Sequence, residues 1–234
     1  MEINYSGIKV IGFDADDTLW VNETYFRKAE EEFAKLLSEF ETPNKIDQEL
    51  FKVEIGNLPL YGYGVKAFTL SMVQSALELS NYTIPSKTIQ KILNIGKDML
   101  NEPVELLDGV EEVLEELSKK YRLILATKGD LLDQERKLEK SGLTSYFHHI
   151  EVLSDKKEAN YSKLLNHLDI NPSEFLMIGN SLKSDVLPLI NIKAKAIHVP
   201  FHTTWAHEMV TEKETNGKEY KTIPSLRELL KLVP

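Results

Sequence analysis

Hydrophobic and polar positions follow two patterns along the chain. Short apolar runs rich in β-branched residues are bounded by Gly, Pro, Asp, Asn or Lys, and they show no regular alternation of apolar and polar residues. Such runs are typical of strands buried on both faces of a parallel sheet. They predict four strands and a weaker fifth, at Ile8–Phe13, Tyr121–Ala126, Phe175–Ile178, Ala194–Val199 and, more weakly, Ile150–Leu153.

The second pattern is the three- and four-residue spacing of a helix that buries one face. From about residue 106 onward, segments of this kind alternate with the strands, which predicts βαβ units with right-handed crossovers. The predicted helices lie at about 110–117, 131–138, 161–168, 186–190 and 226–232. The fold class expected is therefore α/β, with a Rossmann-like parallel sheet core and helices on both of its faces.

Between Trp20 and about Pro103 the sequence shows helical spacing and no convincing strand. Three apolar stripes recur there, beginning at Phe26, Phe68 and Ile89, and glycines interrupt the region in its middle, at positions 56, 62 and 64. A helical insertion of roughly 80 residues after the first strand indicates a separate domain. We therefore expect an all-helical cap at residues 21–103, inserted into a catalytic core of residues 1–20 and 104–234.

Composition narrows the function. Acidic residues outnumber basic ones by 37 to 28, for a formal net charge of −9, whereas sequence-independent binding of nucleic acid needs a basic face. The chain has no cysteine, which excludes disulfides and thiolate-rich zinc sites. The N-terminal segment has no basic region before its apolar run, so it resembles neither a signal peptide nor a membrane span. We expect a soluble, cytoplasmic protein without nucleic-acid or membrane partners, and its oligomeric state is left open.

A cluster of acids follows the first predicted strand: Asp14, Asp16 and Asp17. Ligands of open parallel sheets bind beyond the carboxyl ends of the strands, and adjacent carboxylates repel one another unless a cation holds them. A calcium loop is excluded because its glycine and glutamate positions hold Leu19 and Tyr25. Capping of the next helix would need one acid rather than three, although Asp17 could serve that purpose. The cluster therefore predicts a divalent-metal site.

Three later strands also end in polar segments. Thr127 and Lys128 follow the second strand, Lys156 and Lys157 follow the weak strand, and the stretch Gly179–Asp185 follows the next one. Because the carboxyl ends of parallel strands meet at the same edge of a sheet, we expect these groups to lie beside the acidic cluster. A hydroxyl, an ammonium and a further carboxylate would then face one site.

In this order, the segments resemble the motifs of the haloacid dehalogenase-like superfamily of phosphohydrolases, in members with a helical cap after motif one. Motif one of that family, Asp-x-Asp-x-Thr, is matched by Asp14, Asp16 and Thr18. Motif two, a Ser or Thr at the end of the second strand, is matched by Thr127, and Lys128 follows it as a candidate substrate-binding residue. The resemblance covers essentially the whole chain.

Motifs three and four complete the resemblance. The motif-three lysine is matched by Lys156, with Lys157 as a close competitor. Motif four is commonly Gly-Asp-Ser-x-x-x-Asp, and Gly179–Asp185 matches it except that Asn180 replaces the first acid. This departure leaves Asp185 as the expected metal ligand. Asn180 would support the metal ligands or act as a weak oxygen ligand, and it is also a candidate substrate-binding residue.

The resemblance implies a Mg²⁺-dependent phosphatase acting on a small phosphorylated metabolite. Asp14 would attack phosphorus and form an aspartyl phosphate, and Asp16 would protonate the leaving oxygen and then activate water. Mg²⁺ would be held by the carboxylates of Asp14 and Asp185 and by the backbone carbonyl of Asp16. Thr127 and Lys156 would bind the phosphoryl oxygens as charge develops.

Other members of the family set the alternatives. Dehalogenases lack the second aspartate because a halide needs no proton, and ion-pumping ATPases carry Thr there, so Asp16 favours a phosphatase. A sugar-phosphate mutase would keep both acids, and a non-catalytic phosphate-binding regulator could share the scaffold. Nucleoside monophosphates, sugar phosphates and phosphoglycolate all remain candidate substrates.

The cap contains a segment of unusual composition, Leu58–Lys66, in which Tyr61 and Tyr63 alternate with glycines before Lys66. Glycine loosens the backbone and removes contact area, so the segment is a poor core element. We predict a loop that contacts substrate, in which Tyr63 and Lys66 recognise the part of the substrate beyond the phosphate. An ordinary turn between helices is the alternative.

A further group of residues, His198, His202, His207 and Glu208, resembles a metal cluster by composition. Its spacings match no zinc pattern. We interpret it as a surface loop that packs Trp205 on the edge of the sheet.

Overall fold

A computed structural model describes residues 4–233. It contains a six-stranded sheet with the order β3-β2-β1-β4-β5-β6, in which every neighbouring pair of strands is parallel. The strands are β1 (Val10–Phe13), β2 (Arg122–Lys128), β3 (His149–Leu153), β4 (Phe175–Gly179), β5 (Lys195–His198) and β6 (Lys221–Thr222). The parallel α/β sheet predicted from the sequence is confirmed.

The register brings three strand ends together. Phe13, the last residue of β1, pairs with Leu125 of β2 on one side and with Ile178 of β4 on the other. The residues that follow these positions therefore emerge at the same edge of the sheet, which is where the polar segments of the sequence begin.

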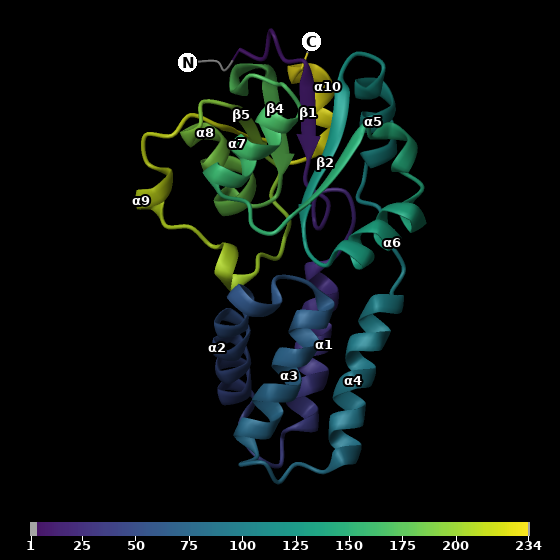
Figure 1. Cartoon of the computed structure of the whole chain (residues 1–234), viewed down its shortest axis with the longest axis vertical. Coiled ribbons are helices and arrows are strands. Elements are labelled where there is room, and N and C mark those ends of the chain that lie inside the picture. Colours follow the sequence, from purple (N-terminus) through teal and green to yellow (C-terminus); the bar gives the residue numbers. More distant parts are fainter. Residues whose placement is uncertain (1–3, 234) are drawn as a thin grey trace. The chain divides into compact units, whose positions relative to one another are not determined.

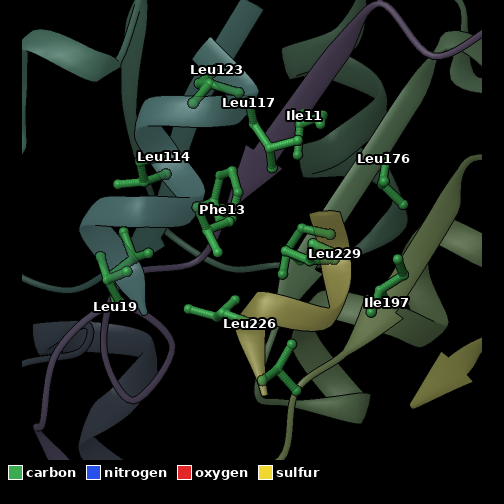
Figure 2. Close-up of a cluster of buried hydrophobic side chains, with 14 of the residues drawn as sticks. Ile11, Phe13, Leu19, Leu114, Leu117, Leu123, Leu176, Ile197, Leu226 and Leu229 are labelled. Carbon is green, nitrogen blue, oxygen red and sulfur yellow. The ribbon is translucent and has the colours of Figure 1, made fainter. Parts of the chain in front are cut away.

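Two hydrophobic clusters cover the two faces of the sheet. Ile11 and Phe13 of β1 belong to the first cluster, and Val10 belongs to the second, as the two-residue period of a strand requires. Figure 2 shows the first cluster, where Ile11 and Phe13 lie near Leu117 and Leu229 from the covering helices. Burial on both faces explains why the strands read as continuous apolar runs.

The helices that accompany the sheet are short. They are α5 (Val110–Ser118), α6 (Leu131–Ser141), α7 (Glu158–His167), α8 (Leu187–Asn191), α9 (Glu212–Thr215) and α10 (Leu229–Leu232). Residues of α5 and α10 belong to the first cluster, and residues of α7 and α8 belong to the second. Each strand except the short β6 is thus covered by helices that the apolar spacing had indicated.

The chain divides into two compact units. One unit contains the sheet and comprises residues up to Glu23, residues 104–128 and residues from 136 onward. The other unit comprises residues 24–103 together with residues 129–135, and the short segment 129–135 was not part of the sequence-based cap.

The second unit is built around four helices: α1 (Glu23–Leu36), α2 (Pro43–Tyr61), α3 (Val65–Leu79) and α4 (Ser86–Asn101) (Figure 1). Their apolar stripes meet in a core of their own, which includes Phe33, Leu50, Met72 and Ile92. Three of these helices match the predicted stripes. Helix α2 was not predicted, because the glycines at 56, 62 and 64 were taken as interruptions, although Pro43 at its start is a favourable helix-opening residue.

The segment Leu58–Lys66 is not the loop that the sequence suggested. Helix α2 continues to Tyr61, and α3 already begins at Val65, so the connection consists of Gly62, Tyr63 and Gly64. Both glycines have positive φ, 71° and 105°, which a residue with a side chain rarely adopts. The glycines therefore serve a tight turn between helices, which was the alternative that the sequence left open, and the loop is limited to residues 62–64.

Two smaller features complete the fold. Strand β6 was not predicted because both of its residues are exposed and neither is apolar. Within residues 4–233, no helix combines the length and apolar character that crossing a bilayer requires.

Candidate active site

Asp14 lies at the carboxyl end of the central strand, where its backbone N–H donates to the carbonyl of Ile178 at 2.9 Å. Its side chain is buried, and so are the side chains of Thr127, at the tip of β2, and Asp185, in the turn that follows β4. The sheet therefore brings the residues predicted from motifs one, two and four to one edge.

Lys156 connects two of these acids. Its Nζ donates to Oδ1 of Asp14 at 2.5 Å and to Oδ1 of Asp185 at 2.6 Å, and its side chain is 1% exposed. Lys157, the competitor for motif three, is 74% exposed and pairs with Asp155. Geometry thus places Lys156, and not Lys157, at the cluster.

The charges of this cluster do not balance, since one ammonium faces two carboxylates. Burial raises the pKa of Asp14 to about 7, because the attraction of Lys156 is partly cancelled by the nearby charges of Asp185 and Asp16. Burial acts to lower the pKa of Lys156, but Asp14 and Asp185 outweigh it and raise that pKa well above its usual value. With both carboxylates ionised the cluster has excess negative charge, which together with burial raises the pKa of Asp14 and which a bound cation would offset.

A tight turn fixes Asp185. The segment Leu182–Val186 forms a π-helical turn, and Ser181 closes it: its backbone N–H donates to Oδ2 of Asp185 at 3.0 Å, and its carbonyl accepts the Asp185 N–H at 2.8 Å. A Cβ atom at Gly179 would lie 2.3 Å from Cγ of Asp185. Glycine is therefore needed at position 179 for the carboxylate to come this close to the strand end.

Thr18 and Asn180 surround the other oxygen of Asp14. The Thr18 hydroxyl donates to Oδ2 of Asp14 at 3.0 Å and accepts the backbone N–H of Asn180 at 3.1 Å. With its nitrogen turned toward the carboxylate, the Asn180 amide donates to Asp14 Oδ2 at 3.2 Å and to the carbonyl of Asp16 at 3.3 Å. The Asn180 nitrogen thus reaches both Asp14 Oδ2 and the Asp16 carbonyl oxygen, so these two oxygens face a common point.

The oxygen atoms at these strand ends suit a hard cation as ligands. Mg²⁺ prefers oxygen ligands, commonly takes only one or two carboxylates and keeps several waters. The carboxylate of Asp14, the carbonyl of Asp16 and the carboxylate of Asp185 form such a set. Within residues 4–233, no group of three or more His, Cys, Asp or Glu side chains is arranged to hold a metal, and the histidine-rich segment at 198–208 forms none.

Asp16 is held by side chains that the sequence analysis did not assign to the site. Its Oδ1 accepts from Nε1 of Trp20 at 2.8 Å and from Nζ of Lys137 at 3.0 Å, and Lys137 also donates to Oδ1 of Asn22 at 2.7 Å. Lys137 lies on α6, more than a hundred residues along the chain. No local pattern marks such a partner.

Asp17 caps the start of α1, a role that the sequence had offered as a possibility for this residue. Its carboxylate accepts the backbone N–H groups of Asn22 and Glu23 at 2.8 to 3.0 Å, at the start of α1. Burial raises the pKa of Asp17 to about 7, against the lowering effect of these two hydrogen bonds. Asp17 thus joins motif one to the first helix of the chain.

Lys128 has a carboxylate partner of its own. Its Nζ donates to Oε1 of Glu208 at 2.7 Å and to the hydroxyl of Ser184 at 2.8 Å. Burial acts to raise the pKa of Glu208, but the charge of Lys128 and hydrogen bonds from Lys128, Ser181 and Ser184 lower it to about 2. Glu208 entered the sequence analysis only as a member of the rejected metal cluster.

The two predicted substrate-binding residues of the helical unit lie at the α2–α3 turn. Lys66 donates to Oδ1 of Asp130 at 2.8 Å, within the same unit, and its side chain is 48% exposed. Tyr63 is the middle residue of the turn. Their part in substrate recognition stays a prediction.

Comparison with known proteins identifies the family of this chain. The family model described as haloacid dehalogenase-like hydrolase matches residues 8–192. N-acylneuraminate-9-phosphatases of Homo sapiens and Mus musculus are each 24% identical over 202 residues, which is 82% of this chain and 82% of the relative.

Solved structures of similar fold include haloacid dehalogenase-like hydrolases. A haloacid dehalogenase-like family hydrolase from Xanthomonas campestris is 38% identical and superposes with a TM-score of 0.85, covering 95% of this chain and 88% of the other. L-2-haloacid dehalogenase from Xanthobacter autotrophicus, 14% identical with a TM-score of 0.61 over 97% of this chain and 98% of its own, shares the fold. The family match spans most of the chain, so the protein belongs to the haloacid dehalogenase-like hydrolase family.

Proposed function

We propose that this hydrolase is a Mg²⁺-dependent phosphatase that cleaves a small phosphomonoester through an aspartyl phosphate on Asp14. The observation that carries the proposal is the buried Asp14–Lys156–Asp185 cluster at the strand ends, with a second acid, Asp16, two residues after Asp14. The phosphatase names of the curated relatives support the same reaction class.

Hydrogen bonds to both oxygens of Asp14 support its proposed role as the nucleophile. Lys156 donates to its Oδ1 and Thr18 donates to its Oδ2, so the carboxylate is fixed before substrate arrives. In-line attack of this carboxylate on phosphorus forms the acyl phosphate and releases the alcohol, which divides one displacement into two easier steps.

Lys156 and Thr127 are proposed to stabilise the phosphoryl oxygens. An ammonium has three donor positions, and Asp14 and Asp185 use two of those of Lys156, which leaves the third for a phosphoryl oxygen. Thr127 adds a buried hydroxyl at the tip of β2. Such preorganised donors strengthen as negative charge develops in the transition state.

Asp16 is proposed to transfer the protons. It would donate one to the leaving oxygen and then accept one from the water that attacks the aspartyl phosphate. Trp20 and Lys137 orient its carboxylate. The likeness to a solved dehalogenase concerns the fold alone, and this second acid favours a phosphatase because a halide leaving group needs no proton.

Mg²⁺ would be held by Asp14, the carbonyl of Asp16 and Asp185, three oxygen donors that fit its preferences. When bound, the ion reduces the repulsion between the nucleophilic carboxylate and the phosphate. The excess negative charge of the cluster supports this assignment.

We propose further that the helical unit is a cap that selects the part of the substrate beyond the phosphate. The substrate would be a small phosphorylated metabolite, and nucleoside monophosphates, sugar phosphates and phosphoglycolate are the classes to compare. A phosphorylated sugar acid such as N-acylneuraminate 9-phosphate joins them because of the curated relatives.

The test is a screen of these esters and of p-nitrophenyl phosphate, with released phosphate measured in Mg²⁺ and in excess chelator. We expect release that stops in the chelator and is absent from an Asp14→Asn preparation purified in parallel, which controls for contaminating phosphatases. Phosphate binding without turnover of any ester would indicate the regulator instead, and conversion of one sugar phosphate into its isomer would indicate a mutase.

A further inference from the structure

A second charge cluster, largely shielded from solvent, lies beside the proposed active site. Oε2 of Glu208 accepts hydrogen bonds from the hydroxyls of Ser181 and Ser184, both at 2.5 Å, and Oε1 accepts from Nζ of Lys128 at 2.7 Å. The side chains of Lys128 and Glu208 are 14% and 12% exposed. Both oxygens of Glu208 are therefore engaged by the protein itself.

This cluster joins three segments that are distant in the sequence. Lys128 ends β2, Ser181 and Ser184 belong to the turn after β4, and Glu208 ends the 3₁₀ turn 206–208. Ser184 also accepts a hydrogen bond from Lys128 at 2.8 Å, which closes a ring of contacts among these segments. The tip of β2 and the turn after β4 are the positions of motifs two and four.

The serines connect Glu208 to Asp185. Besides donating to Glu208, the Ser181 hydroxyl accepts the backbone N–H of Ser184 at 3.0 Å, so it caps the π-helical turn. The backbone N–H of Ser181 donates directly to Oδ2 of Asp185. A shift of the Ser181 hydroxyl would therefore move the turn that aims the Asp185 carboxylate.

Substitution of Glu208 would remove the partner of Lys128 and the acceptor that Ser181 and Ser184 share. Removing one partner of a buried ion pair leaves the other charge uncompensated, so Lys128 would pull away toward water or toward other acids. The two serines would lose their shared acceptor at the same time. Both effects act on the turn after β4.

We propose that Glu208 is a positioning residue: it holds the turn 181–185 against Lys128 and thereby sets the affinity of Asp185 for Mg²⁺. The proposal rests on the proposed function only in taking Asp185 as a metal ligand. It assigns to Lys128 a structural partner, Glu208, in place of contact with the phosphate.

The experiment measures Mg²⁺ binding directly, by titration calorimetry, on wild-type protein and on Glu208→Ala, Glu208→Gln and Ser184→Ala. The matched control is Glu219→Gln, an exposed glutamate of the same C-terminal region. We expect Glu208→Ala to weaken Mg²⁺ binding about tenfold, the size typical for partners of metal ligands. Glu208→Gln, which keeps the shape and part of the hydrogen bonding, should recover part of this loss, and Ser184→Ala should show a smaller loss.

Kinetics give a second readout. With each active ester, Glu208→Ala should raise the Mg²⁺ concentration for half-maximal rate about tenfold, while KM for the ester at saturating Mg²⁺ stays within about twofold of wild type. If Lys128 contacted the substrate, the Lys128→Met variant would instead show a raised KM for the ester. If Lys128→Met also kept the Mg²⁺ dependence of the wild type, the proposal would be overturned.

If Glu208 only stabilised the fold, its variants would differ from wild type in melting temperature and not in Mg²⁺ affinity. Variants of Glu208 that melt at lower temperature but bind Mg²⁺ with wild-type affinity overturn the proposal, and Ser184→Ala decides the matter if Glu208→Ala does not fold. Calorimetry also separates the two proposals. A wild-type protein that binds Mg²⁺ but cleaves no ester would contradict the proposed function, while the Glu208 variants would still report on positioning.

Discussion

Two carboxylates of this protein, the buried Asp14 and the largely shielded Glu208, each contact a lysine, yet their pKa values move in opposite directions. The pKa of Asp14 is raised to about 7 and that of Glu208 is lowered to about 2. Burial acts to raise both. The difference comes from the neighbouring groups: Asp14 shares Lys156 with a second carboxylate, Asp185, whereas Glu208 accepts hydrogen bonds from Lys128 and from two serine hydroxyls.

The comparison separates an incompletely neutralised cluster from a satisfied one. In the Asp14 cluster the excess negative charge is a cost that the folded chain carries without a cation, which is typical of functional sites. In the Glu208 cluster each charge is matched and hydrogen-bonded, as buried charges in a structural role require.

The largest effect is expected for Asp14→Asn. The amide keeps the shape of the side chain but is a poor nucleophile, so ester hydrolysis should fall by a factor of about 10⁴ or more. Steady-state release of phosphate measures the effect, and circular dichroism checks that the fold is retained. Turnover within about tenfold of wild type would remove Asp14 from the nucleophile role.

Asp16→Asn should lower turnover by about 10² to 10⁴, the usual contribution of general acid–base catalysis. The loss should be steep for alkyl phosphates and smaller for esters whose leaving group has a low pKa, because such a group needs no proton. A series of aryl and alkyl phosphates provides the measurement. Equal losses across the series would contradict the proton-transfer role.

Asp185→Ala should weaken Mg²⁺ binding by more than about 100-fold, because it removes a proposed ligand rather than a supporting group. Lys183→Ala is the matched control in the same turn, since Lys183 donates to the carbonyl of His207 and contacts neither Asp14 nor Asp185. The Mg²⁺ concentration for half-maximal activity distinguishes the two variants. Equal effects would mean that motif four has been assigned incorrectly.

The Glu208 cluster predicts a pH-dependent stability. Because the pKa of Glu208 is lowered from 4.5 to about 2 on folding, its contribution is complete above pH 4.5 and is lost as the pH falls toward 2. The shift corresponds to about 3 kcal/mol of unfolding free energy at neutral pH. Glu208→Gln should remove this part of the acid dependence, as urea unfolding between pH 6 and pH 2.5 can measure.

The exposed glutamate provides the control for this measurement. Glu219→Gln should leave the acid dependence of unfolding close to that of wild type. If Glu208→Gln and wild type lost stability in parallel between pH 4.5 and pH 2.5, the pKa of Glu208 would not be lowered by folding.

An exposed pair in the helical unit should have the smallest effect. Lys66 and Asp130 form an ion pair that is too exposed to stabilise the fold by much. If Lys66 and Tyr63 contact substrate, Lys66→Ala and Tyr63→Ala should lower kcat/KM for the true substrate about tenfold, or ~1.4 kcal/mol, and leave p-nitrophenyl phosphate nearly unchanged. A uniform loss across esters, or none, would contradict this role.

The sequence identified the elements whose pattern is local. A strand was predicted at Ile8–Phe13, where β1 spans Val10–Phe13, because burial on both faces requires a continuous apolar run. The acids after it were informative because parallel sheets bind ligands at the strand ends. Helix α2 was missed because Gly56 was taken as an interruption, whereas Ile46, Leu50 and Val53 of this helix are buried at helical spacing. Local propensity was overridden there by packing against the other helices.

The sequence by itself determined the α/β class of this protein and the order of Asp14, Thr127, Lys156 and Asp185 along it, because burial patterns and strand-end motifs are properties of short segments. Tertiary structure alone decided between Lys156 and Lys157, and it brought Glu208 to Lys128 and Lys137 to Asp16. These pairs are separated by 80 and 121 residues, and no periodicity within a segment records a contact across such distances. The charges of neighbouring groups, and hence the opposite acidities of Asp14 and Glu208, follow from those contacts.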